Sequence, residues 1–141
     1  MPQLKKLKPG YSETTSDDFR SFIDECEYWI DRYGLRGWET KYSHECTEGY
    51  YATTSWDSES RHVTFNISTI VPDIEYTPYD IALSAFHEVT ELLMYKIHMY
   101  SQEYDIKPER TIEDVHEIIR ILENTFFRPD WNFRKYGQNI T

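Results

Sequence analysis

The chain has 141 residues, which suits one domain, since single cores of about 100 to 150 residues are the commonest size. Aromatic residues make up 16% of the chain, so a hydrophobic core can form without disulfides. The formal net charge of -10 argues against nucleic acid as a direct partner, because phosphate binding needs a surplus of Lys and Arg.

The cysteines and the apolar runs indicate a cellular setting. Cys26 and Cys46 have neither a metal-like nor a disulfide-framework spacing, and we expect both to be free, packed thiols. No apolar run approaches the roughly 18 residues of a membrane span, so no membrane partner is expected. The sequence therefore favours a cytoplasmic location, and it gives no oligomeric state.

The first half of the chain predicts a helix followed by strands. Residues 1–14 are expected to form a flexible N-terminal arm. A helix is predicted from Thr15 or Ser16, whose hydroxyls can cap it, to Gly34. Strand-like segments follow at 38–42, 50–56 and 62–69, and the polar turn at 57–60 predicts that the last two form a hairpin.

Two helix-start signals mark the second half. Thr77-Pro78 opens a long helix predicted to reach about residue 101, and Thr111 opens another that Pro129 should stop near residue 127. Residues 129–141 are predicted to form an aromatic C-terminal tail that can pack against the domain. We therefore predict one α+β domain over 15–128, with an N-terminal helix, a small three-stranded, mostly antiparallel sheet, a long helix and a C-terminal helix.

The predicted long helix has an apolar and a polar arc. The apolar arc, which is the expected core face, comprises Ala82, Ala85, Phe86, Val89, Leu92, Leu93 and Ile97. The polar arc comprises Asp80, Ser84, His87, Glu88, Glu91, Tyr95 and His98. His87 and Glu91 are four residues apart, so they lie one turn above the other and can bind one metal ion. Glu88, beside His87, can then act as general base toward water, the arrangement of a metal hydrolase.

A zinc hydrolase site needs three protein ligands and one open position. His116 lies on the flank of the apolar stripe of the final helix and is the expected third ligand, whereas Glu117 should point to solvent. Glu123 and Arg120 are candidates for supporting contacts, and Tyr95 for stabilising an oxyanion. His98 is roughly 16 Å from His87 along a straight helix rising about 1.5 Å per residue, too far for the same ion.

An ordinary solvated helix face would also explain this polar stripe. On that interpretation His116 is a surface histidine of a helix. His44 and His62 are interpreted as strand or loop residues rather than ligands.

These residues resemble those of a known family, the small metallopeptidases encoded by bacteriophages. The similarity spans about residues 17 to 127. It rests on Glu25-Cys26-Glu27-Tyr28-Trp29-Ile30, Gly34-Leu35-Arg36-Gly37-Trp38, Trp56, Arg61, Ser68-Thr69, Ala85-Phe86-His87-Glu88-Val89, Leu92-Leu93, Val115-His116, Arg120, Leu122 and Glu123, in that order.

The resemblance implies a minimal zincin-like fold that binds one zinc ion. In it, His87 and Glu88 match the first two functional positions of the family's motif, and His116 matches a histidine in the following helix. Glu91 stands where the family usually has histidine. Two histidines with one glutamate are nevertheless a ligand set that zinc peptidases use.

Two functions are compatible with these features. The first is a zinc-dependent peptidase or related amide hydrolase, acting on a peptide or protein held along a strand edge near residues 62–69, in the host cytoplasm. The second is a catalytically inactive protein whose acidic, Tyr-rich surface blocks a basic host protein. DNA mimicry is a weaker third, because the acidic residues are spread along the chain.

Overall fold

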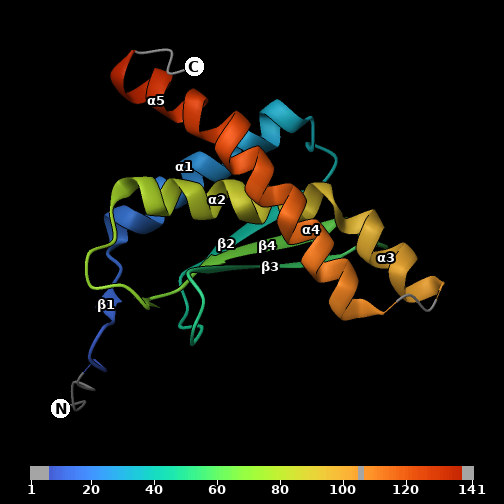
Figure 1. Cartoon of the computed structure of the whole chain (residues 1–141), viewed down its shortest axis with the longest axis horizontal. Coiled ribbons are helices and arrows are strands. Elements are labelled where there is room, and N and C mark those ends of the chain that lie inside the picture. The colour runs from blue at the N-terminus through green and yellow to red at the C-terminus, as the bar shows by residue number, and fades with distance from the viewer. Residues whose placement is uncertain (1–6, 105–106, 138–141) are drawn as a thin grey trace.

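The computed structural model describes residues 7–104 and 107–137, and Figure 1 shows how its elements are arranged. The expected α+β class is confirmed. The elements in chain order are β1 (Ser12–Glu13), α1 (Ser16–Tyr33), β2 (Glu39–Ser43), β3 (Ala52–Asp57), β4 (His62–Ile67), β5 (Ile70–Val71), α2 (Pro78–Leu93), α3 (Tyr95–Glu103), α4 (Pro108–Leu122), the π-helical turn η1 (Glu123–Phe127) and α5 (Arg128–Tyr136).

The helices α1 and α2 begin at the predicted threonine caps. The Thr15 hydroxyl accepts a hydrogen bond from the backbone N–H of Asp18 at 3.1 Å, and the Asp18 carboxylate accepts one from the backbone N–H of Thr15 at 2.8 Å. Thr77 and Asp80 repeat this capping box at α2. Reciprocal bonding of this kind satisfies donors that a helix start leaves without partners. Gly34 ends α1 in the left-handed conformation, with φ 69°.

The three-stranded sheet has the order β2-β4-β3. The predicted hairpin is confirmed, because β3 and β4 pair antiparallel. The expectation of mostly antiparallel pairing is wrong for the other pair, since β2 and β4 run parallel. The chain passes from β2 to the far edge and returns through the centre as β4, the strand with the most buried side chains. A central strand buries more apolar surface than an edge strand, which favours β4 in that place.

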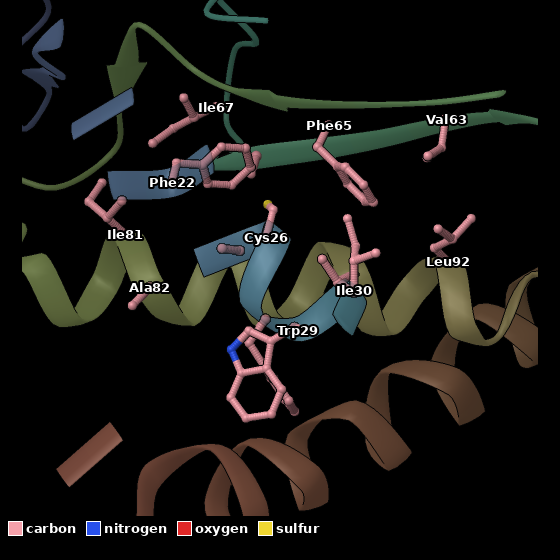
Figure 2. Packing of buried hydrophobic residues seen from close by; sticks show 14 of the residues in the cluster. Phe22, Cys26, Trp29, Ile30, Val63, Phe65, Ile67, Ile81, Ala82 and Leu92 are labelled. Carbon is pink, nitrogen blue, oxygen red and sulfur yellow. The ribbon is translucent and has the colours of Figure 1, made fainter. Parts of the chain in front are cut away.

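The core lies between the sheet and the helices α1 and α2. Figure 2 shows side chains of α1, β4 and α2 meeting around Cys26, while Trp29 points away from the sheet, toward the C-terminal helix, where its ring lies 6.0 Å from that of Phe127. Cys26 is buried and Cys46 is exposed, and both are free thiols. The expectation that both thiols are packed therefore holds only for Cys26.

The predicted long helix is divided at Met94 into α2 and α3. The break turns Tyr95 into the core, where its ring meets Trp38 edge-on at a centroid distance of 5.0 Å. Leu93 and Ile97, which were predicted for the core face, are exposed to solvent. The other predicted core residues of this helix are buried: Ala82, Ala85, Phe86, Val89 and Leu92.

The final helix is longer than predicted at both ends. It begins at Pro108 rather than at Thr111, whose hydroxyl lies 2.7 Å from that of Ser101. The predicted stop at Pro129 is wrong, because α4, η1 and α5 follow one another without a gap and form one long helix that crosses α2 in Figure 1. The π-helical turn just before Pro129 changes the backbone hydrogen-bond pattern where a proline would otherwise break the helix.

The two segments predicted to flank the domain, the arm 1–14 and the tail 129–141, both contribute to the fold. Trp131 is buried in the core, so the tail predicted at 129–141 belongs to the domain as far as residue 137, and 138–141 lie outside the described residues. Within the predicted arm 1–14, β1 pairs with β5 and Thr14 is buried, while 1–6 lie outside the described residues. Across the described ranges, no helix is long and apolar enough to cross a bilayer.

Candidate metal centre

Three predicted ligands from two helices come together. His87 and Glu91 lie on α2 and His116 lies on α4, and each offers one ligand atom, all within 4.8 Å of one another. Oε1 of Glu91 is 3.4 Å from Nε2 of His87 and 2.8 Å from Nε2 of His116. The carboxylate is therefore the centre of the group, with one imidazole on its own helix and one on the crossing helix.

Glu123 supports this group from the opposite side of His87. Its Oε1 lies 3.5 Å from Nδ1 of His87, and Nε2 of the same ring faces Glu91. Metal-binding histidines usually donate their second ring N–H to a carboxylate or carbonyl, which fixes the ring and its tautomer. Glu123 has the position that this arrangement requires.

Glu88 points into the same region but is more deeply buried, with 8% of its surface exposed. Its Oε2 accepts a hydrogen bond from the hydroxyl of Thr54, on β3, at 2.5 Å. Burial raises the pKa of Glu88 to about 7, although the Thr54 bond and the charge of His87 oppose the shift. A carboxyl group with a pKa near neutrality is suited to taking up and releasing a proton.

The charges around His87 and Glu91 are strongly linked. Burial alone would lower the pKa of His87, but hydrogen bonding to Glu123 and Glu91 and the charges of Glu88 and Glu123 raise it to about 10. Burial would raise the pKa of Glu91, but bonding to His87 and the nearby charges of His87, His116 and His98 lower it. Without an ion, His87 is thus protonated and Glu91 ionised at neutral pH.

These residues line a cavity of about 590 Å³. The cavity lies between β3 and α4, with the polar face of α2 between them. Its lining includes all three candidate ligands together with Glu88, Glu123, His98 and the β3 residues Ala52, Thr53, Thr54 and Trp56. A small molecule or an extended segment of another chain can therefore approach the ligand group from the side of an edge strand.

The donor set fits a zinc ion. Zinc binds imidazole nitrogen and carboxylate oxygen at about 2.0 to 2.2 Å, which places tetrahedral ligand atoms roughly 3.3 Å apart. The three ligand atoms here are within 4.8 Å of one another, so side-chain adjustments of about an ångström would bring them to that spacing. Binding would displace the proton from His87, because a metal ligand must be the neutral imidazole.

The remaining sequence-predicted residues lie elsewhere. Tyr95 is packed in the core against Trp38 and does not line the cavity. Arg120 and Glu117 are exposed on α4, as was expected of Glu117. The two histidines not expected to be ligands have other neighbours. Nε2 of His44 lies 2.7 Å from the Thr14 hydroxyl, and Nε2 of His62 lies 2.6 Å from Oε2 of Glu39.

Sequence reasoning missed two residues of the site. Thr54 contacts Glu88 from a strand 34 positions earlier in the chain, and no local pattern indicates that contact. His98 was set aside because of its distance from His87, yet its Nε2 lies 3.4 Å from Oε2 of Glu91. The seven-residue spacing of His98 from Glu91 puts both on one side of a regular helix but about 10 Å apart along it, so the spacing alone does not indicate a contact across the break at Met94.

Comparison of the chain with models of protein families, with curated proteins and with solved structures gives no match.

Proposed function

We propose that the protein is a zinc-dependent peptidase or related amide hydrolase, similar in kind to the small zincin-like peptidases of bacteriophages, that acts in the host cytoplasm. One observation carries the proposal. His87, Glu91 and His116 converge to within 4.8 Å of one another in a cavity that Glu88 also lines. Three ligands, an open side and a carboxyl group of raised pKa are the parts that a hydrolytic zinc site needs.

The residues of the chain would divide the work as follows. His87, Glu91 and His116 would hold the ion, which when bound acts as a Lewis acid toward water and a carbonyl group. Glu88 would take a proton from the attacking water and pass it to the leaving amine. Because Thr54 donates to Oε2 of Glu88, Oε1 is the oxygen that would move the proton.

An edge strand supports a peptide as the substrate. The strand edge expected near residues 62–69 is not available, because β4 is central and pairs on both sides. The edge that lines the cavity belongs to β3, which pairs with β4 alone in the described sheet. An extended peptide can add to such an edge through backbone hydrogen bonds, and its scissile bond would then pass in front of Glu88.

A specific observation also supports the second candidate, an acidic protein that blocks a basic host protein. The Glu91 carboxylate already has three imidazole neighbours, with Nε2 of His87, His98 and His116 at 2.8 to 3.4 Å. A carboxylate with such partners would not need a metal to balance its charge, and the net charge of -10 suits a basic partner.

Metal content and hydrolysis, measured on the same preparations, test the proposal. We expect about one zinc per chain in the wild type and a loss in His87→Ala and His116→Ala, while His62→Ala, at an exposed site, retains it. Glu88→Gln should retain zinc and lose at least about a hundredfold in peptide hydrolysis. A wild type that takes up no zinc would overturn the metal centre. One that binds zinc, and cleaves no peptide in a broad library, would favour the blocking function.

A further inference from the structure

His98 contacts the metal centre through a ligand rather than through the ion. It lies on α3, beyond the break at Met94, and is not among the residues whose ligand atoms cluster within 4.8 Å. Its Nε2 is 3.4 Å from Oε2 of Glu91, the oxygen that does not face His87 and His116. The two oxygens of Glu91 therefore have different neighbours.

The surroundings of His98 restrict its ring. The side chain is only 19% exposed and packs against Trp56 at a ring-centroid distance of 5.8 Å. Its Nε2 is shielded from solvent and makes no well-aligned hydrogen bond to any described residue, although Oε2 of Glu91 is within ion-pair distance. A buried N–H gains from completing such a contact, and either the neutral Nε2–H tautomer or the imidazolium can donate it.

We propose that His98 is a positioning residue that holds Oε2 of Glu91, so that Glu91 presents only Oε1 to a bound cation. The inference rests on the proposed metal centre and adds how that centre keeps a position open. A glutamate bound through both oxygens would occupy one more position around the ion. Held through one oxygen, Glu91 leaves three protein ligands and a free position, which catalysis by zinc requires.

Substitutions of the full chain separate the hydrogen bond from the packing. His98→Phe keeps a ring against Trp56 but removes the donor, and His98→Gln keeps an N–H donor. His62→Phe changes a histidine that pairs with Glu39 on the surface, away from the cavity, and serves as the matched control. Two ions serve as probes. The affinity for Zn²⁺ is measured by competition with a chromogenic chelator. The geometry of the site is measured with Co²⁺, whose visible absorption is stronger with four ligands than with five.

We expect His98→Phe to bind Zn²⁺ about 10- to 100-fold more weakly than the wild type, a typical loss when a contact behind a metal ligand is removed. Its Co²⁺ absorption should weaken and shift as the second oxygen of Glu91 joins the ion. His98→Gln should stay close to the wild type, and His62→Phe should equal it. In a Glu91→Gln background, His98→Phe should have little further effect, because its action passes through Glu91.

Several results would overturn the inference. Wild-type affinity and an unchanged Co²⁺ spectrum in His98→Phe would show that His98 does not hold Glu91, while leaving the metal centre intact. A wild type that binds neither ion would overturn the centre and the inference together. If circular dichroism shows that His98→Phe does not fold, His98→Leu replaces it. Its Zn²⁺ affinity and Co²⁺ spectrum are then compared with those of the wild type, with the same outcomes expected.

Discussion

The Thr54 hydroxyl lies 2.5 Å from Oε2 of Glu88 and 3.1 Å from the backbone carbonyl oxygen of the same residue. One side chain of β3 thus contacts both the main chain and the carboxyl group of α2. This contact ties the edge strand of the cavity to the residue proposed to move the proton.

Replacing Thr54 with Val should weaken the fold. Valine has nearly the same shape but cannot donate a hydrogen bond, so the buried carboxyl group of Glu88 would lose its partner. We expect the free energy of unfolding, measured in urea at pH 7, to fall by about 1 to 2 kcal/mol. Thr54→Ser keeps the hydroxyl and should lose clearly less. Equal losses in the two variants would attribute the effect to packing instead.

Removing the charge of Glu123 should weaken zinc binding. Glu123→Gln leaves a side chain of the same size next to Nδ1 of His87 but a poorer hydrogen-bond acceptor. We expect the affinity for Zn²⁺, measured by chelator competition, to fall about tenfold. Glu117→Gln removes a carboxylate from the exposed side of the same helix and should change nothing. A similar small change in both variants would exclude a supporting role for Glu123.

Acid should weaken the hydrogen bonds around Glu27 of α1. The Tyr42 hydroxyl and Nη1 of Arg36 each donate to Glu27 at 2.5 Å. Burial opposes the charged form, but these two bonds and the charge of Arg36 lower the pKa of Glu27 below its ordinary value of 4.5.

A group whose pKa is lowered by folding stabilises the fold above its unfolded pKa, and this contribution is lost as the pH falls through the folded pKa. Glu27→Gln should therefore be less stable than the wild type by about 0.5 kcal/mol at pH 7, a value kept small because the pair is partly exposed. The difference should shrink at pH 3 in urea unfolding. A difference that persists unchanged at pH 3 would show that the charge of Glu27 is not its source.

The helix α5 should contribute substantially to stability. Trp131 is 7% exposed and packs on Phe127 and Tyr79, whereas Phe133, two residues later, is 55% exposed. We expect Trp131→Ala to lower the free energy of unfolding by about 3 to 4 kcal/mol. Phe133→Ala should change it by less than about 0.5 kcal/mol. Comparable losses at the two positions would contradict the packing of this helix.

The sequence predicted the features that depend on helical spacing and capping. Thr15, Gly34 and Thr77 mark helix ends through local chemistry, and the four-residue spacing of His87 and Glu91 places them together on any regular helix. His116 could be chosen over Glu117 because its position on the flank of an apolar stripe turns it toward a neighbouring helix.

Features set by tertiary packing could not be predicted. The break at Met94 has no glycine or proline to mark it, and the burial of Tyr95 against Trp38 accompanies it. The parallel pairing of β2 depends on which strand takes the centre of the sheet. Pro129 was expected to end a helix, because nothing in the sequence announces the π-helical turn before it.

The π-helical turn η1 changes the direction in which side chains point along the long C-terminal helix. A π-helical turn is equivalent to one inserted residue, and one residue rotates the following side chains by about 100°. Before it, α4 directs His116 toward the cavity, and after it, α5 directs Trp131 into the core. Deleting one residue from Glu123–Phe127 would restore a regular helix, and His116 could then no longer face the candidate metal site while Trp131 packs in the core.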